Sequence, residues 1–476
     1  MFFNSLEFFF FLPTVFLLYW FVFNKNLRVQ NLLIVISSYV FYGWWDWRFL
    51  SLLFLSTVVD YFVGLIIYRS TDNQVRRRIL WISILFNVGL LGVFKYYNFF
   101  IDSWINLLGS VGYEQNSAWT LNVILPVGIS FYTFQTMSYS LDIYYQKIKP
   151  TKDIISFAAF VSFFPQLVAG PIERACNLLP QLLKKRVFKY EKGVQGLRLI
   201  LWGMFKKVVI ADSLAWRVDY SFENFQILDG GTLLLGLIYF SIQIYCDFSG
   251  YSDIAIGTSK LFGIEIMSNF KFPYFSRNIG EFWRRWHISL SSWLRDYLYI
   301  PLGGSRKGKW LSIRNVLIIF IISGFWHGAN WTFIVWGLTH TLLFLPLFLI
   351  GRNRQFTKGI VAENTWLPSI KELFQMGATF FPVTIAWVFF RSETILDAFQ
   401  YLYKIFFEFN FPLTNRSGII FVFLLVIIDW FWRKDERNPL NINYNYYRWI
   451  VYVLILYLIF GNLEIVNMNQ FIYFQF

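Results

Sequence analysis

Charged residues are scarce in this sequence, and their scarcity decides its class. Only 15% of the 476 residues are Asp, Glu, Lys or Arg, whereas 57% are hydrophobic and 22% are aromatic. A soluble domain usually carries about 25% charged residues, and it could not keep this much apolar surface away from water. The composition therefore predicts an all-α, polytopic membrane protein.

Cysteine is almost absent as well. Cys176 and Cys246 lie far apart and form no CxxC pair, so neither a disulfide framework nor a zinc site is indicated. The formal net charge of +14 does not indicate nucleic-acid binding, because the basic residues lie in short connections between apolar segments, where the positive-inside rule places them. Residues 1–23 lack the basic start and cleavage site of a removed signal peptide, so we expect a retained first helix.

About 12 apolar segments are candidates for transmembrane helices. They are residues 6–23, 30–43, 49–68, 79–97, 123–143, 194–212, 231–247, 313–325, 329–350, 373–390, 417–432 and 446–461. The apolar segment 154–170 is broken by prolines and glycine, which predicts a re-entrant or interfacial segment. An outside N-terminus places every basic connection in the cytoplasm. Residues 248–311 are then cytoplasmic and 462–476 extracytoplasmic, within a single domain spanning 1–476.

Residues 281–300 have the pattern of one amphipathic helix. Its apolar positions recur at steps of three and four: Trp283, Trp286, His287, Leu290, Trp293, Leu294, Tyr297 and Leu298. Pro301 should end this helix. A helix with tryptophans on one face suits a membrane interface or the wall of a cavity, and the pattern places His287 on the buried side.

The chain has three histidines, His287, His327 and His340. Ionisable side chains are costly inside a bilayer, so their default interpretation is a functional site. His327 lies in GFWHGANW, where Gly324 and Gly328 allow close approach of a substrate or of another backbone. The alternatives are a histidine hydrogen-bonded within a helix break for His327 and an interfacial anchor for His287. For His340, which lies in a regular apolar segment, we expect a hydrogen-bonded packing residue.

Buried histidines of this kind indicate acid–base chemistry. An imidazole accepts a proton from a hydroxyl and returns it to a leaving group. In the same motif, Trp326 is a candidate tunnel-lining residue, and Asn330 could orient the imidazole or the reacting carbonyl. No serine or cysteine lies in a nucleophile-elbow context. His287 and His327 have no third ligand nearby, so we expect no metal.

Four motifs resemble the membrane-bound O-acyltransferase (MBOAT) family, and within it the bacterial branch that O-acetylates alginate, peptidoglycan or cellulose. They are FFPQLVAGPIE (163–173), EFWRRWH (281–287), YIPLGG (299–304) and GFWHGANW (324–331). The resemblance implies tilted helices around a central tunnel, with a donor entering from the cytoplasm and an acceptor from outside. It makes His327 the central catalytic histidine and His287 the second motif histidine. It also implies a separate extracytoplasmic, SGNH-like acyltransferase as partner.

Two further groups of residues are candidates for supporting roles. The basic glycine-rich loop with Arg306, Lys307 and Lys309 suits the phosphates of acetyl-CoA, although a loop obeying the positive-inside rule looks the same. Asp247, Ser249 and Asp253 lie near the end of a span, where they could line a cavity and support the histidines. Helix capping by Ser249 or Asp253 is the alternative.

The chain ends FIYFQF, residues 471–476. This aromatic tail could insert into a cavity, with Tyr473 accepting the acyl group and handing it on. Interfacial anchoring is the alternative.

These features together predict an O-acetyltransferase of the bacterial inner membrane. It would pass acetyl from acetyl-CoA, with no bound cofactor, to an extracytoplasmic polysaccharide. A D-alanyl transferase that modifies teichoic acid from a carrier-protein donor is the first alternative, and a lipid or sterol acyltransferase is another. A proton-coupled transporter with intramembrane histidines is a third, but its two related halves are not evident in the sequence.

Overall fold

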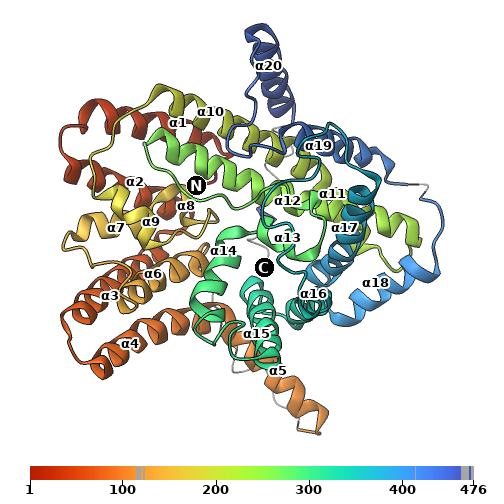
Figure 1. The fold of residues 1–476 in the computed structure, drawn as a ribbon, viewed down its shortest axis with the longest axis horizontal. Helices are drawn as coiled ribbons and strands as arrows, with labels where there is room; N and C mark the ends of the chain where they lie inside the picture. The colour runs from red at the N-terminus through yellow and green to blue at the C-terminus, as the bar shows by residue number, and fades with distance from the viewer. Residues whose placement is uncertain (114–119, 122–123, 413, 463–470, 473–476) are drawn as a thin grey trace. The chain divides into compact units, whose positions relative to one another are not determined.

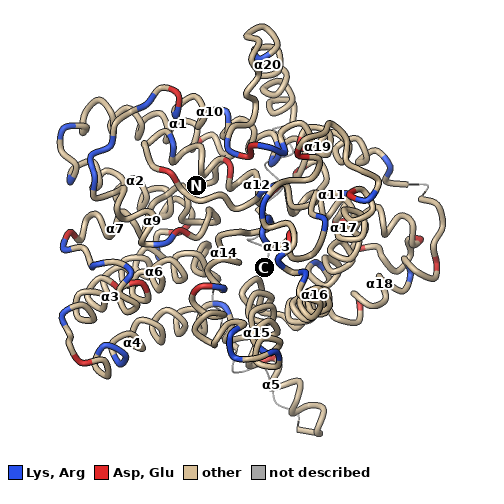
Figure 2. The backbone as a smooth tube through the Cα atoms, in the orientation of Figure 1, with Lys and Arg blue, Asp and Glu red and all other residues tan. Residues whose placement is uncertain are grey.

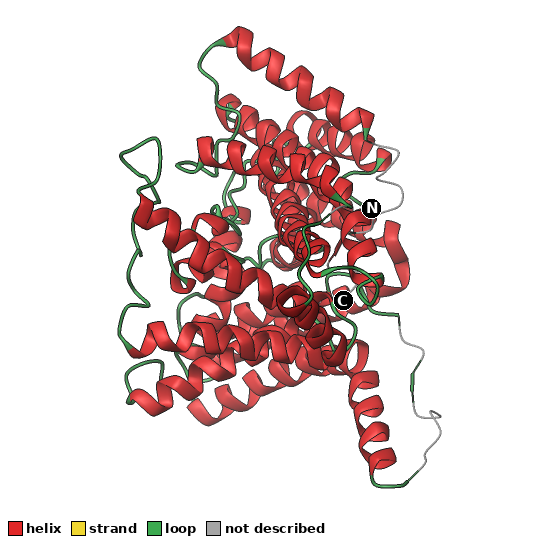
Figure 3. Cartoon of the chain, turned by 90° about the vertical axis from the view of Figure 1, so that its right-hand side faces the viewer, coloured by secondary structure: helices red, strands yellow, loops and turns green. Residues whose placement is uncertain are grey.

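The computed structural model describes residues 1–113, 120–121, 124–412, 414–462 and 471–472. All regular structure in these ranges is helical (Figure 3), and Figure 1 labels the α-helices in chain order. Among the described residues, six helical segments are long and apolar enough to cross a membrane: Leu27–Arg69, Asn73–Ser110, Gly230–Leu261, Lys309–His327, Trp331–Leu349 and Ile370–Arg391. The expected all-α, polytopic membrane class is confirmed. Figure 2 shows most helices uncharged along much of their length.

The described chain forms two compact units, one of residues 1–193 with 258–266 and the other of residues 194–257 with 267–476. In the first unit the helices are α1 (Leu6–Leu17), α2 (Leu27–Asp46), α3 (Leu50–Arg69), α4 (Asn73–Leu91), α5 (Tyr97–Ser110), α6 (Ile129–Tyr144), α7 (Ile154–Ser162), α8 (Phe164–Leu167) and α9 (Ala175–Leu182). The interrupted segment predicted at 154–170 is confirmed as the short helices α7 and α8, whereas its position relative to the membrane stays a prediction.

A buried carboxylate joins three helices of the first unit. Asp60 on α3 accepts hydrogen bonds from Ser83 and Asn87 on α4 and from Ser140 on α6, the last two at 2.8 and 2.6 Å. Gly64, one turn further along α3, allows the ring of Tyr139 to pack against the helix backbone. Polar residues shared between helices and small residues at the contact are the usual means of helix association within a bilayer.

The second unit carries most of α10 (Tyr190–Met204) and α12 (Gly230–Leu261). Its other helices are α11 (Asp212–Glu223), α13 (Ile279–Arg285), α14 (Ile288–Leu294), α15 (Lys309–His327), α16 (Trp331–Leu349), α17 (Ile370–Arg391), α18 (Ile395–Phe407), α19 (Ile419–Trp432) and α20 (Asn445–Gly461). Side-chain caps fix several starts. Ser369 and Glu372 form a capping box at the start of α17, an arrangement that satisfies backbone donors the helix leaves free.

Candidate active site

The GFWHGANW motif forms the tight connection between α15 and α16. His327 is the last residue of α15, and the Asn330 carboxamide caps α16 by accepting a hydrogen bond from Thr332 N–H at 3.0 Å. A Cβ atom at Gly324 would collide with the carbonyl of Phe333, and one at Gly328 with the Phe333 ring. The glycines therefore allow close packing against α16, one of the two uses predicted for them.

Substituting Gly328 with alanine should destabilise the protein. The new methyl group must displace the Phe333 ring, and overpacking of this kind costs about 1–3 kcal/mol. Thermal unfolding of the purified variant measures the loss. Gly89→Ala on α4 is the matched control, because a Cβ atom there meets nothing within 4 Å; equal stability of the two variants would contradict the predicted clash.

His287 lies at a helix break, which corrects the expectation of one helix over residues 281–300. The helix α13 ends at Arg285, and α14 begins at Ile288. Between them His287 has a φ of 42°, in the left-handed region that side chains seldom adopt. Helical periodicity missed the break because the apolar positions continue at steps of three and four on both sides of it. His287 is nevertheless buried, with 1% of its surface exposed, so its burial was predicted correctly.

The hydrogen bonds of His287 define its tautomer. Its Nδ1 lies 3.1 Å from Oδ1 of Asn269, and the same oxygen accepts a hydrogen bond from the Ser289 hydroxyl at 2.8 Å. Since Asn269 Oδ1 is an acceptor, Nδ1 of His287 carries the proton and Nε2 carries the lone pair. Nε2 is buried and has no hydrogen-bond partner within the described ranges. His287 thus holds an unprotonated ring nitrogen that no described residue binds.

The structure brings His287 and His327 together. Their ring centroids are 6.0 Å apart, and the Trp326 ring lies beside both, at 5.7 Å from His287 and 5.0 Å from His327. Trp336 and Phe390 cover other sides of the His327 ring at 5.3 and 5.2 Å. Two histidines distant in sequence therefore share one aromatic surrounding from which bulk water is largely excluded.

His340 belongs to the same surroundings. Its ring lies 4.7 Å from Trp336 and 4.9 Å from Trp283. Neither of its ring nitrogens has a hydrogen-bond partner among the described residues, which corrects the expectation of a hydrogen-bonded packing histidine. The indole N–H groups of Trp283 and Trp336 are likewise buried without a described acceptor. Buried polar groups are normally satisfied, so this cluster suits a bound substrate or water.

The other candidates lie elsewhere. Asn330 donates to the Glu393 carbonyl at 3.0 Å besides capping α16, so no described contact directs its amide at an imidazole. Arg306 and Lys307, in the connection leading to α15, and Lys309, the first residue of α15, have exposed side chains. Donor binding by these three residues stays a prediction.

Asp247 and Ser249, on α12, bind two buried lysines. These are Lys207 and Lys206 of the π-helical segment Phe205–Ala211. Asp247 Oδ1 lies 2.8 Å from Lys207 Nζ, which is also 2.8 Å from Asp212. Ser249 accepts a hydrogen bond from Lys206 at 2.8 Å. These contacts make the roles of Asp247 and Ser249 indirect: between them in sequence, the Phe248 ring packs on His287 at 4.7 Å.

Sequence reasoning missed Asn269, Lys206 and Lys207. The lysine pair did carry a signal, because two adjacent cations inside the apolar segment 194–212 require buried partners. Asn269 carried no such signal, because it lies in the loop after α12 and contacts His287 only in the folded protein.

The start of the aromatic tail is bound to α12. Phe471 lies 5.0 Å from the Tyr251 ring, and the Ile472 N–H donates to Asp247 Oδ2 at 2.7 Å. Both residues are buried. Tyr473 lies outside the described residues, so its acyl-relay role stays a prediction.

Burial lowers the pKa of His287 to about 3, because a poorly solvated site disfavours the imidazolium. The folded pKa lies below the ordinary value of 6.5. The unfolded chain therefore binds more protons between pH 6.5 and 3, and stability is lost as pH falls through this window. We expect the free energy of unfolding to fall by up to about 1.4 kcal/mol per pH unit through this residue. Melting curves at pH 7 and 5 test this: His287→Phe should show a smaller difference than the wild type, and an equal difference would contradict it.

The comparisons with known proteins give the family of the chain. The model of MBOAT, the membrane-bound O-acyltransferase family, matches residues 40–379. The chain belongs to this family and is a multi-pass membrane O-acyltransferase.

Its relatives point to one branch of the family. The chain is 41% identical over 388 residues to the "Probable alginate O-acetylase AlgI" of Pseudomonas syringae pv. tomato, covering 81% of this chain and 71% of the relative. It is 38% identical over 420 residues to the peptidoglycan O-acetyltransferase of Helicobacter pylori, covering 82% and 77%. The teichoic acid D-alanyltransferase of Bacillus subtilis is 29% identical over 263 residues, or 52% of this chain and 63% of the relative.

Proposed function

We propose that this protein is an O-acetyltransferase of the bacterial inner membrane that takes acetyl from cytoplasmic acetyl-CoA for modification of an extracytoplasmic polysaccharide. The observation that carries the proposal is the buried pair of His287 and His327, 6.0 Å apart, in a chain related more closely to O-acetyltransferases than to D-alanyl transfer. A separate SGNH-like acyltransferase completes the transfer to sugar.

His327 acts as the general base of the transfer. It takes the proton of the accepting hydroxyl while the hydroxyl oxygen attacks the thioester carbonyl. A C–O bond forms, the C–S bond breaks, and the thiolate of CoA takes up the proton from the imidazolium. General acid–base assistance of this kind contributes about 10²- to 10⁴-fold. The aromatic rings around His327 limit competing hydrolysis because they keep water away from the thioester.

His287 acts through its Nε2 lone pair. As a neutral base it accepts a hydrogen bond from a donor group of the bound substrate other than the reacting hydroxyl, and so positions the substrate beside His327. Asn269 holds the ring in this tautomer, as orienting partners do for other functional histidines. Arg306, Lys307 and Lys309 attract the donor phosphates.

Tyr473 is the first acceptor in this scheme. Its hydroxyl becomes an acetyl ester as CoA leaves, and the partner acyltransferase then takes the acetyl group and restores the hydroxyl. The anchoring of Phe471 and Ile472 on α12 supports the scheme, because it ties the tail to the helix whose Phe248 packs on His287.

Purified protein in detergent with radiolabelled acetyl-CoA tests the function. We expect release of CoA and label on the C-terminal peptide, with both lost in a variant lacking residues 471–476. Tyr473→Phe should lose the label, while Phe471→Leu, which keeps the hydroxyl, should retain it. Labelling from a D-alanyl carrier protein but not from acetyl-CoA would overturn the proposed donor. Undiminished acetylation without residues 471–476 would overturn the relay alone.

A further inference from the structure

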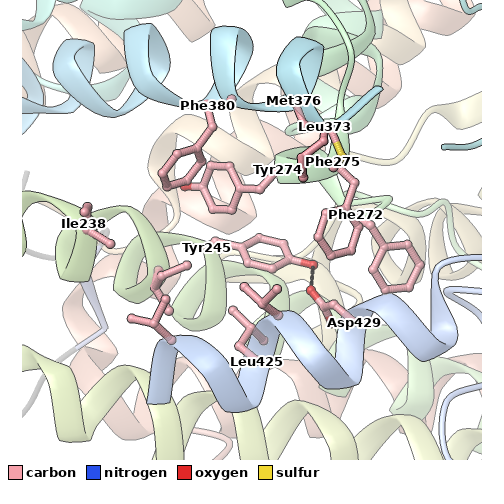
Figure 4. A pocket seen from close by; sticks show the side chains of 14 residues that line it. Ile238, Tyr245, Phe272, Tyr274, Phe275, Leu373, Met376, Phe380, Leu425 and Asp429 are labelled. Carbon is pink, nitrogen blue, oxygen red and sulfur yellow. Dashed lines mark hydrogen bonds between the residues drawn. The ribbon is translucent and has the colours of Figure 1, made fainter. Parts of the chain in front are cut away.

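The second unit contains an apolar cavity that the proposed reaction does not use. It has a volume of about 420 Å³, within the range of about 300–1,000 Å³ typical of small-molecule sites. Residues of α12, α17 and α19 line it together with the segment around Phe272 (Figure 4). Most lining side chains are aliphatic or aromatic, so the cavity suits a hydrocarbon ligand.

The mouth of the cavity opens on an exposed apolar surface. Two of its lining residues, Leu373 on α17 and Val426 on α19, are 58% and 42% exposed. The neighbouring Phe374 and Phe423 are 78% and 62% exposed. In a membrane-spanning protein, exposed apolar side chains of this kind contact acyl chains, which can therefore enter the cavity directly from the bilayer.

One end of the cavity is polar. Asp429 is 4% exposed, and its Oδ2 accepts a hydrogen bond from the Tyr245 hydroxyl at 3.0 Å (Figure 4). Its Oδ1 has no hydrogen-bond partner within the described part of the chain. A buried oxygen of this kind needs a donor, and a ligand that brings both an apolar chain and a donor group satisfies the whole cavity.

The polar end lies near the ends of two of the lining helices. Asp429 is in the last turn of α19, and Leu373 is in the first turn of α17, whereas Val422 and Phe380 line the cavity further inside these helices. Beside Asp429, the Trp430 indole donates to the Trp366 carbonyl at 2.9 Å, and tryptophans mark the membrane interface.

The charges around Asp429 favour a cationic donor. Lys206 is paired with Asp253 at 2.7 Å, and Lys271 with Glu436 at 3.0 Å. Asp429 forms no ion pair with any described residue, and Asp435 also lines the small cavity next to it. The Asp429 carboxylate can therefore accept a hydrogen bond from the ammonium group of a ligand.

We propose that this cavity binds one acyl chain of a bilayer phospholipid whose primary ammonium headgroup donates to Asp429. The site goes beyond the acyl-transfer reaction. Its wall residues Tyr245 and Tyr274 pack on Trp286 at 6.3 and 6.0 Å, so the bound chain supports the residue that precedes His287.

Photo-crosslinking tests the proposal in the whole protein in lipid nanodiscs. The probes are phosphatidylethanolamine and phosphatidylglycerol that carry a diazirine near the end of one acyl chain, and mass spectrometry maps the adducts. We expect adducts on peptides containing Met376 and Val422. Gly377 lines the cavity, and a Cβ atom there meets nothing within 4 Å. Gly377→Phe should therefore fill the cavity and lower the adduct yield at these peptides about tenfold or more.

The control is Gly89→Phe on α4, which adds the same ring at an equally open glycine and should leave the adducts unchanged. Adducts confined to the outward-facing Phe374 and Phe423, or an equal yield in Gly377→Phe and the wild type, would overturn the site. Phosphatidylethanolamine should label the wild type more than phosphatidylglycerol, and Asp429→Asn should remove this preference. Equal labelling of the wild type by the two lipids would overturn the headgroup assignment.

Discussion

Replacing His327 with alanine should lower the rate of thioester cleavage by about 10²- to 10⁴-fold, the usual contribution of a general base, without unfolding the protein. His327 is the last residue of α15, and Gly324 and Gly328 on either side of it have no side chain. The measurement is release of free CoA from acetyl-CoA, followed over a range of donor concentrations. Loss of a base should lower kcat more than it raises KM, because the contact acts mainly in the transition state.

Trp331→Ala provides a control within the same motif. Trp331 is 52% exposed and lies beyond the connection that holds His327, so its removal should leave cleavage close to the wild-type rate. Equal melting temperatures for the two variants would exclude a folding defect. If His327→Ala retained the wild-type kcat, His327 would be a structural residue and the base would have to be sought elsewhere.

Composition alone was sufficient to predict the class of fold, because a soluble protein of this length could not bury so much apolar surface. The site was only partly predictable. The scarcity of histidine drew attention to His287 and His327, and the structure places these two rings together. Their partners could not be found in the same way: Asn269 reaches His287 across 18 residues, and no periodic pattern signals such a loop contact.

The helix break at His287 shows why local patterns were not enough. Steps of three and four along residues 281–300 match a single helix, but the backbone turns into the left-handed region at His287. Local preference disfavours this conformation, so tertiary contacts must hold it. Asn269 supplies two of them, since it binds the ring of His287 and the hydroxyl of Ser289 on the next helix. A rare backbone conformation held by its surroundings is often found where function requires a particular side-chain direction.

Replacing Lys207 with methionine should have the largest effect on stability. Its ammonium group lies between Asp212 and Asp247 at 2.8 Å from each, and the three side chains are 10%, 2% and 3% exposed. Methionine has a similar length, so little packing is lost, but two carboxylates remain buried without their cation. Breaking a buried ion pair by removing one partner costs about 3–5 kcal/mol. Thermal unfolding of the purified protein measures this loss.

Lys192→Met is the matched control, because Lys192 and Glu265 pair at 2.8 Å with both side chains 48% exposed, where a pair contributes about 0–1 kcal/mol. Equal destabilisation of the two variants would contradict the argument from burial. Adding Asp247→Asn to Lys207→Met should restore part of the lost stability, since it removes one of the stranded charges. The same double variant should loosen the tail, because Asp247 also holds the Ile472 N–H at 2.7 Å and an amide oxygen is a weaker acceptor than a carboxylate. The ion pair of Lys207 with Asp247 therefore serves both the stability of the second unit and the position of Ile472.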